Sequence, residues 1–430
     1  IPAATLTAAP GPSEPAIVCP VDTRAGATVL GVTLMLLLAL TGLGLSLMPV
    51  VADQLAAEFG YSDSQLGLLT SAFMLALGVT AIPWGLAGAR WGGRTLAVGL
   101  ALGIAGSLLC AFAASYGGFV AGRLLQGVGL GVIVPTVGSV IPAATAARFR
   151  GRVWGVFGTG HGLGVVLALL ILPSVAAWGG YRGVFLTSAG LIALFGVVAL
   201  AQPAVRQKPG HCGDGVGARA LARALRTTLA NRQVLLLCVF NLAALAVGVG
   251  ALVWTPPYLQ AEFGASVGTS AYLTAGLGVA QLVGNPLGAL AMARWGKKAV
   301  IVASMLLMVA CTALVPLLPG LWLVFVFVTL AGLLTMTYFS PLFAGIAEVT
   351  RDPAQVGAAT GLLEVFGFVG ALVVPWLFGL LLDATGQQTG YLAGYLMLAG
   401  IAAVTCVGLF FLRLPRAGGA TPVRSRPDGA

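Results

Sequence analysis

The chain has 430 residues, of which 59% are hydrophobic and only 8% are charged, with a net charge of +10 at pH 7. Soluble globular domains carry about 25% charged residues, so a chain this poor in charge cannot cover a surface that faces water. The composition therefore excludes a soluble protein and predicts one that is largely covered by lipid.

Apolar segments of roughly 20 residues each, the length that spans a bilayer as a helix, follow one another along the chain. Their length and their lack of period-two alternation favour helices over strands. They cover residues 27–51, 62–88, 95–115, 117–142, 152–174, 182–201, 233–256, 267–292, 299–318, 320–345, 355–382 and 389–412. The sequence thus predicts an all-α membrane protein with twelve transmembrane helices.

The polar segment 202–232 divides these helices into an N-terminal six-helix bundle, 27–201, and a C-terminal one, 233–412. Residues 1–26 and 413–430 are predicted to be tails, the first of them disordered. Two sets of linker residues recur at helical spacing: a basic face of Arg219, Arg223 and Arg226, and an apolar face of Leu221, Leu225 and Leu229. This pattern predicts a helix that lies on the cytoplasmic membrane surface. The alternative is a solvated linker whose arginines only set the topology.

The basic residues predict the orientation of the chain. All but two of the 22 lysines and arginines fall in the tails or in alternate loops on one side; the exceptions are Arg123, inside a helix, and Arg182. By the positive-inside rule, both termini and the linker are cytoplasmic, in a multi-pass protein of the cell membrane. We expect the first spanning helix to serve as the insertion signal. Because topology explains the positive charge, that charge does not indicate nucleic-acid binding.

One stretch of the chain occurs twice, 204 residues apart. Ala57-Glu58-Phe59-Gly60 returns as Ala261-Glu262-Phe263-Gly264, and Arg90-Trp91-Gly92 returns as Arg294-Trp295-Gly296 without a gap. Two related halves of apolar helices are typical of transporters that carry a solute between two bundles.

The loop after the second helix resembles the G-x-x-x-D-R-x-G-R-R/K signature of the major facilitator superfamily, and the resemblance covers nearly the whole chain. The matching residues are Gly85, Arg90, Gly92 and Arg94, with Arg294, Gly296 and Lys298 in the second copy. The resemblance implies a major facilitator fold and a gating role for both loops. Ala89 replaces the acid that helps to lock the family's cytoplasmic gate, so this gate must be held differently. Alternatively, the basic residues only set the topology.

Two further segments resemble family signatures. The fourth helix matches R-x-x-x-G with Arg123 and Gly127, followed by Pro135. In antiporters of the family, a proline follows the fifth-helix glycine that corresponds to Gly164, whereas this chain has Val165. The broken antiporter signature disfavours drug–proton exchange.

Ionisable residues inside the predicted helices are the first candidates for function, because each costs on the order of 3 kcal/mol at a helix centre. Arg123 is predicted to hold a substrate anion; the alternative is that its side chain reaches outward to the membrane surface. Glu364 is predicted to carry the coupling proton, since a buried carboxyl favours its protonated form; the alternative is a lock to a cytoplasmic arginine. His161, with an ordinary pKa of about 6.5, is a second proton carrier and substrate ligand, or else a neutral hydrogen-bonded side chain.

Neutral polar side chains inside the helices complete the predicted substrate site. The predicted substrate-binding residues are Asn241, Gln281, Asn285 and Tyr338. Other polar residues inside the predicted helices are Thr41, Ser46, Tyr272, Thr335 and Thr337. Each can contact a small solute, or can join two helices at about 0.6 kcal/mol.

The sequence contains no catalytic triad, metal cluster or phosphate-binding loop, so we expect no enzyme, cofactor or metal site. The six scattered cysteines do not suggest disulfides. The sequence predicts a monomeric secondary transporter that lies in the lipid bilayer and moves a small solute. The favoured solute is a small organic or inorganic anion, whose transport is coupled to protons. The alternatives are efflux of amphipathic drugs by proton antiport and a transporter-like membrane sensor.

Overall fold

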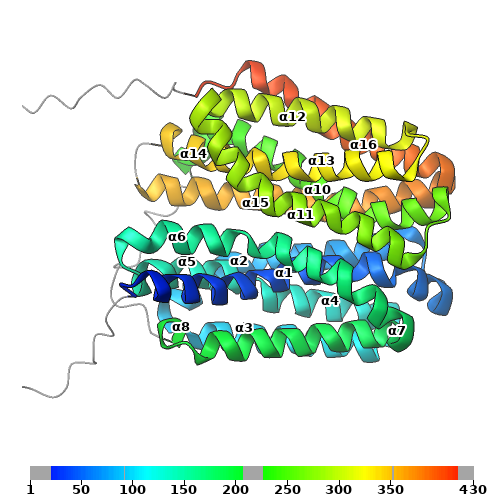
Figure 1. The fold of residues 1–430 in the computed structure, drawn as a ribbon, viewed down its shortest axis with the longest axis horizontal. Coiled ribbons are helices and arrows are strands. Elements are labelled where there is room, and N and C mark those ends of the chain that lie inside the picture. The colour runs from blue at the N-terminus through cyan, green and yellow to red at the C-terminus, as the bar shows by residue number, and fades with distance from the viewer. Residues whose placement is uncertain (1–20, 92, 207–225, 351–352, 415–430) are drawn as a thin grey trace, which may run out of the picture.

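The computed structural model describes residues 21–91, 93–206, 226–350 and 353–414, and Figure 1 shows them as two halves built from long helices. Elements α1 to α8 form one half, and elements α10 to α16 form the other. Within the described residues, the only extended pairing is an isolated bridge between Val21 and Thr145. The predicted all-α fold is confirmed.

The N-terminal half consists of α1 (Arg24–Phe59), α2 (Asp63–Trp91), α3 (Gly93–Phe112), α4 (Tyr116–Leu130), α5 (Ile133–Ala144), α6 (Ala147–Gly158), α7 (Gly160–Ala201) and α8 (Pro203–Arg206). The predicted fourth helix is divided into α4 and α5, and the fifth begins as α6 and continues into α7. Gly180 has φ 60° and ψ −168°, a conformation that favours glycine, and it separates the fifth span from the sixth within α7.

The C-terminal half consists of α10 (Arg232–Phe263), α11 (Val267–Trp295), α12 (Lys297–Leu314), η1 (Val315–Leu317), α13 (Leu321–Thr337), α14 (Phe339–Val349), α15 (Pro353–Thr385), α16 (Gln387–Cys406) and η2 (Val407–Phe410). Its predicted fourth helix is also broken, at Tyr338 between α13 and α14. Both halves therefore interrupt the same helix of the six.

The sequence repeat forms the same structure in each half. Helices α1 and α10 end at Phe59 and Phe263, and the next residue in each case is a glycine with positive φ that caps the helix. Helices α2 and α11 end 204 residues apart, at Trp91 and Trp295. The two halves are thus structural repeats, as predicted.

The number of membrane spans agrees with the sequence. In the part of the chain that the structure describes, 11 helical stretches are long and apolar enough to cross a membrane. The stretch Arg148–Ala201 has 54 residues, and the interruption at Gly180 divides it into two spans, which gives the predicted twelve. Helix α1 begins at Arg24, inside the predicted disordered tail. Most of that tail and most of the predicted surface helix lie outside the described residues.

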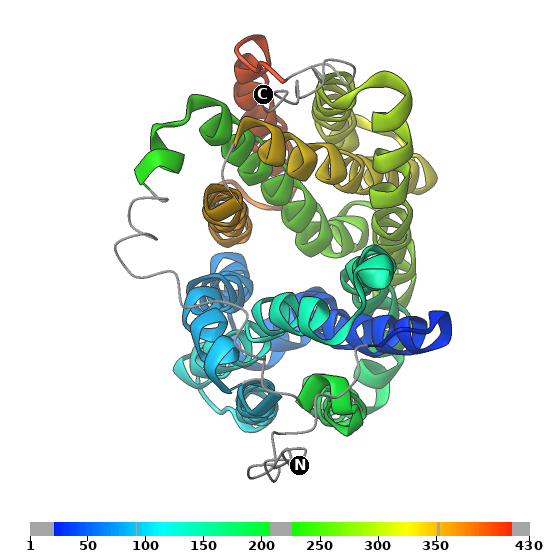
Figure 2. The same ribbon diagram turned by 90° about the vertical axis from the view of Figure 1, so that its left-hand side faces the viewer.

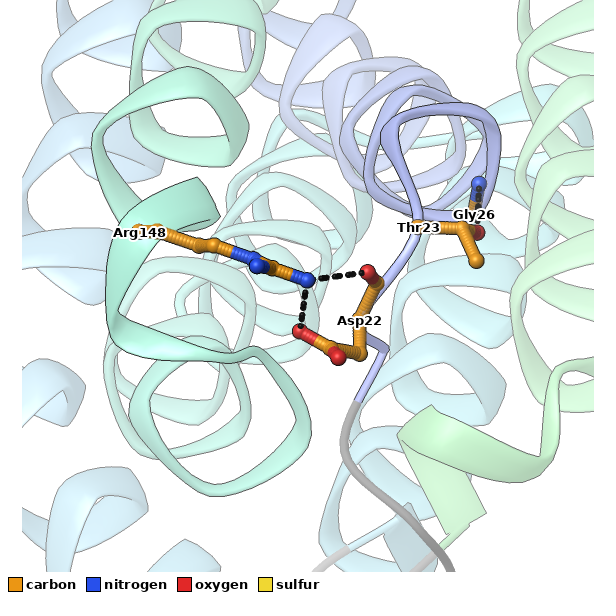
Figure 3. A network of polar contacts seen from close by, with 4 residues as sticks. All are labelled: Asp22, Thr23, Gly26 and Arg148. Carbon is orange, nitrogen blue, oxygen red and sulfur yellow. Dashed lines mark hydrogen bonds and ion pairs between the residues drawn. The ribbon is translucent and has the colours of Figure 1, made fainter.

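The beginning of α1 is fixed to the rest of its half by the contacts in Figure 3. Thr23 Oγ1 caps the helix by accepting a hydrogen bond from the backbone N–H of Gly26 at 3.1 Å. Arg148 of α6 forms an ion pair with Asp22 at 2.9 Å. Because both charged side chains are largely exposed, this pair positions the segment more than it stabilises the fold.

The two ends of the molecule differ in charge. We call the end where α1 begins, at the left of Figure 1, the basic end, and the opposite end the far end. The basic end carries Arg24, Arg94, Arg148, Arg294 and Lys298 at or near helix ends.

The two halves are in close contact toward the far end. The backbone N–H groups of Asp63 and Ser64, at the start of α2, donate hydrogen bonds to the Asp383 carboxylate of α15, each at 3.0 Å. The side chain of Gln260 in α10 also lies within interaction range of the Asp53 carboxyl in α1. These contacts join helices from different halves and close the far end.

Glycines along α2 and α15 show that the halves separate toward the basic end. A Cβ atom at Gly67 would lie 2.2 Å from the carbonyl oxygen of Pro375, and one at Gly78 would lie 3.0 Å from Phe368. Gly361 lies about two turns beyond Phe368 on the same face of α15, and an added Cβ there would meet none of the described atoms within 4 Å.

Helices α6, α7 and α11 show the same divergence. A Cβ at Gly162 would lie 3.0 Å from the carbonyl oxygen of Gly278, and one at Gly158 would lie 3.9 Å from Asn285 Nδ2. At Gly155, about one turn closer to the basic end, an added Cβ would lie more than 4 Å from every atom of the described parts. The molecule is thus closed at the far end and open at the basic end, from which Figure 2 views the two halves.

Candidate substrate and coupling site

Tyr338 and Asn241 form a buried pair inside the C-terminal half. The Tyr338 hydroxyl donates to Asn241 Oδ1 at 2.7 Å, and Asn241 Nδ2 donates to the carbonyl oxygen of Leu363 at 2.9 Å. The pair connects α10, the break between α13 and α14, and α15. Because Asn241 is 0% and Tyr338 is 1% exposed, the pair joins helices in this conformation and offers no surface to a solute.

Glu364 follows Leu363 in α15, next to this buried pair. Its side chain is half-buried, and its carboxyl lies within electrostatic range of the Tyr338 hydroxyl. It forms no ion pair with any arginine or lysine whose side chain the structure describes. The lock to a cytoplasmic arginine, the alternative for this residue, is therefore not formed with a described partner.

His161 lies near the start of α7, just after the break at Thr159. Its Nδ1 lies 3.1 Å from Oγ1 of Thr41 in α1, whose hydroxyl donates to the carbonyl oxygen of Leu38 at 2.7 Å. Since a hydroxyl has one proton to donate, Nδ1 carries the hydrogen and donates it to Thr41. In a neutral ring, Nε2 is then left as a hydrogen-bond acceptor on a half-buried side chain.

Close packing holds the His161 segment against α1. A Cβ at Gly42 would lie 2.1 Å from the carbonyl oxygen of His161, and one at Gly164 would lie 1.8 Å from that of Ala39. Only glycine permits this approach, so the backbones of α1 and α7 are in direct contact around His161.

Gln281 and Asn285 lie about one turn apart on α11, on the side that faces the N-terminal half. The Ser340 hydroxyl of α14 is hydrogen-bonded to Asn285 Oδ1, and Asn285 Nδ2 is directed toward Gly158. Gln281 Oε1 is buried and has no hydrogen-bond partner in the structure. Asn285 thus presents a donor at the level where the two halves begin to separate.

Arg123 is completely buried inside the N-terminal half. Its Nη1 donates to the carbonyl oxygen of Gly44 at 2.9 Å and to Gln126 Oε1 at 2.6 Å, and its Nε donates to the carbonyl oxygen of Leu69 at 3.3 Å. Its guanidinium carbon lies 4.5 Å from the centre of the Phe73 ring. The side chain is directed toward α1 and α2, so the alternative of a side chain that reaches the membrane surface is wrong for this conformation.

The charge of Arg123 is not neutralised by an acid among the described residues. Its Nη2 is buried and has no hydrogen-bond partner. The neighbouring Gln126 donates to Ser107 at 2.9 Å and to Ser188 at 3.2 Å, which extends the polar network to α3 and α7. The N-terminal half thus contains a fixed positive charge held mainly by neutral oxygen atoms.

The predicted gate loops lie at the basic end. Arg94 and Arg294 are exposed, Lys298 donates to the carbonyl oxygen of Leu412 at 2.7 Å, and Gly296 caps α11 with φ 83°. Gly85 lies near Pro135 of its own half. Gly92 and the Arg90 side chain lie outside the described parts. Lys297 forms an ion pair with Glu348 of the same half. None of these contacts joins the two halves, in agreement with an open basic end.

Several residues of these networks were missed in the sequence. Gln126 lies three residues after Arg123 on the same helix, a spacing that predicts contact. Ser107, Ser188 and Ser340 gave no signal, because isolated serines are common in membrane helices and their partners lie on other elements. Among the described residues, no group of three or more His, Cys, Asp or Glu side chains is arranged to bind a metal ion.

The comparisons with known proteins identify the family. The model of the Major Facilitator Superfamily matches residues 34–272 and 236–429. A gentisate transporter of Corynebacterium glutamicum is 27% identical over 84% of this chain and 82% of its own. A probable nitrate/nitrite transporter of Mycobacterium tuberculosis is 28% identical over 82% of this chain and 88% of its own.

A solved structure agrees in fold. The crystal structure of a D-xylose–proton symporter superposes with a TM-score of 0.75 and 15% identity, over 92% of this chain and 99% of that one. The sequence family, the repeated six-helix halves and this superposition lead to one conclusion: the chain belongs to the major facilitator superfamily.

Proposed function

We propose that the protein is a secondary transporter that moves a small organic or inorganic anion, coupled to protons, by alternating access. The observation that carries this proposal is the unneutralised Arg123 charge in one half, together with the free donor of Asn285 where the halves separate. A fixed cation inside the N-terminal half and a hydrogen-bond donor on the C-terminal half each favour an anionic solute over a cationic one. The named solutes of two relatives, gentisate and nitrate/nitrite, are anions and support the same choice.

In this proposal the basic end faces the cytoplasm and the structure is an inward-open state. The positive-inside rule supports that orientation. A single cysteine in place of Ala293 at the basic end should be protected from an impermeant maleimide in intact cells, and one in place of Glu58 at the far end should be modified. The reverse pattern would overturn the orientation.

Glu364 is the proposed proton-coupling residue. Its carboxyl is half-buried and lacks a described ionic partner, so its charged form is poorly compensated. A change in the orientation of the halves would change its access to water and with it the affinity for a proton. His161, whose Nε2 is an open acceptor, is the second candidate.

Counterflow in proteoliposomes tests the transport function. Vesicles loaded with an unlabelled anion should accumulate the same labelled anion, with gentisate and nitrate as first probes and a wider set of small carboxylates next. Accumulation of amphipathic dyes alone would instead support drug efflux. Some solutes will raise the melting temperature of the protein because they bind it. If none of these solutes shows counterflow, the result would support the sensor alternative.

A further inference from the structure

A cavity of about 490 Å³ lies at the basic end of the C-terminal half, apart from the proposed substrate site. It is formed where the start of α10 meets η2 and the residues after it. The residues that matter for its chemistry are Arg232, Gln233, Leu236, Phe410, Phe411 and Arg413.

Gln233 fixes the two sides of this cavity relative to each other. Its Nε2 donates to the carbonyl oxygen of Phe411 at 3.1 Å, and its Oε1 accepts from the backbone N–H of Arg413 at 2.7 Å. Lys298 holds the same segment through the carbonyl oxygen of Leu412 at 2.7 Å. The Gln233 amide thus joins the start of α10 to the segment after η2, and this places Arg232 on one side of the cavity and Arg413 on the other.

The two arginines of the cavity have no partner among the described residues. Neither Arg232 nor Arg413 forms a described ion pair or side-chain hydrogen bond, both residues are exposed, and none of the described residues that line the cavity is acidic. The N-terminus of α10 is already capped by Asn231, which accepts from the backbone N–H groups of Gln233 and Val234. The positive charge is therefore available to an external anion.

The remaining wall of the cavity is apolar and uncovered. Phe410 is 87% and Phe411 is 63% exposed, and Leu236 lies beside them. An exposed aromatic wall in the same cavity as two arginines that lack a described partner matches an amphipathic molecule with an anionic head, since guanidinium groups bind phosphate in bidentate fashion. Free phosphate would leave the aromatic wall uncovered.

We propose that this cavity binds an anionic phospholipid, with the phosphate between Arg232 and Arg413 and an acyl chain along Phe410 and Phe411. Basic pockets at the membrane boundary, formed where helix ends meet, are suited to such headgroups. The proposal does not depend on which solute the protein carries.

Binding of phosphatidylglycerol to the full-length protein in detergent tests the proposal, measured by native mass spectrometry and by thermal shift. Phosphatidylcholine with the same acyl chains is the lipid control. The Arg232→Gln/Arg413→Gln variant should bind phosphatidylglycerol about tenfold more weakly or worse, because two charge-assisted contacts are lost. The Arg94→Gln/Arg152→Gln variant removes two charges from the same end of the other half and should bind it like the unaltered protein.

Phe410→Ala provides an independent variant. It should weaken the binding of long-chain phosphatidylglycerol and leave both arginines in place. The proposal is overturned if the double arginine variant binds phosphatidylglycerol like the control variant, or if phosphatidylcholine binds equally well. It is also overturned if inorganic phosphate alone reproduces the thermal shift, which would assign the arginines to a free anion.

Discussion

The carboxylate of Asp383 caps α2 from the other half of the molecule, accepting the backbone N–H of Asp63 at 3.0 Å. Its second oxygen accepts from Ser64 at the same distance. The first N–H groups of a helix have no partner within the helix, and a carboxylate there also interacts favourably with the helix dipole. Because α2 and α15 belong to different halves, this cap exists only while the far end is closed.

We predict that Asp383→Ala opens the far end more often. Loss of a helix cap costs about 1 kcal/mol, which corresponds to about a fivefold change in the closed-to-open ratio. A reporter cysteine in place of Ser71, which is 1% exposed and donates to the Leu372 carbonyl across the interface, should then react faster with a maleimide. Glu58→Gln, which removes an exposed acid near the same end, should leave that rate unchanged. Equal rates in all three proteins would contradict the role of Asp383.

Gly155→Leu is predicted to block transport without disturbing the fold. A Cβ atom added at Gly155 meets no described atom within 4 Å in the open state, but alternating access requires the other half to approach this surface. Gly190→Leu is the matched control, because Gly190 also has no atom within 4 Å of an added Cβ and lies in the second span of α7. Both variants should have similar melting temperatures, and only the first should lose counterflow. Full activity of Gly155→Leu would mean that the basic end does not close there.

Arg123→Ala should abolish transport and also lower stability. Its loss leaves the buried Gln126 Oε1 without its donor, which costs about 1–3 kcal/mol, whereas the carbonyl oxygens of Gly44 and Leu69 keep their donors within α1 and α2. Arg123→Lys should retain only part of the transport activity and of the stability, since lysine keeps the charge but lacks the planar, forked guanidinium group. Thermal unfolding together with counterflow measures both effects. A melting temperature equal to that of the unaltered protein would show that these hydrogen bonds contribute nothing.

The sequence predicted the fold well because the relevant signals are local. Span length and the 204-residue repeat require no knowledge of tertiary contacts. The capping glycines Gly60 and Gly264 are the last residues of the repeated Ala-Glu-Phe-Gly segments. The breaks at Thr159 and Tyr338 were not predicted. Neither residue is itself a helix breaker, but Pro341, which has no backbone N–H, lies three residues after Tyr338 in the first turn of α14.

The contacts of the candidate site were harder to predict. The cap of α2 by Asp383 joins residues 320 positions apart, which no local pattern reveals. Arg123 was identified by its charge, but its direction toward Gly44 and Leu69 depends on how α1, α2 and α4 meet. The substrate roles predicted for Asn241, Gln281, Asn285 and Tyr338 remain predictions, and the first and last of these are bonded to each other in the open state.

Accumulation driven by a pH gradient in proteoliposomes measures whether Glu364 couples transport to protons. With an anion identified by counterflow, the unaltered protein should concentrate it in response to the gradient. Glu364→Gln, which mimics the protonated carboxyl, should lose accumulation and keep exchange, because exchange moves no net protons. His161→Asn should change the pH dependence without uncoupling, and Glu58→Gln should behave normally. Gradient-driven accumulation by Glu364→Gln equal to that of the unaltered protein would contradict the account.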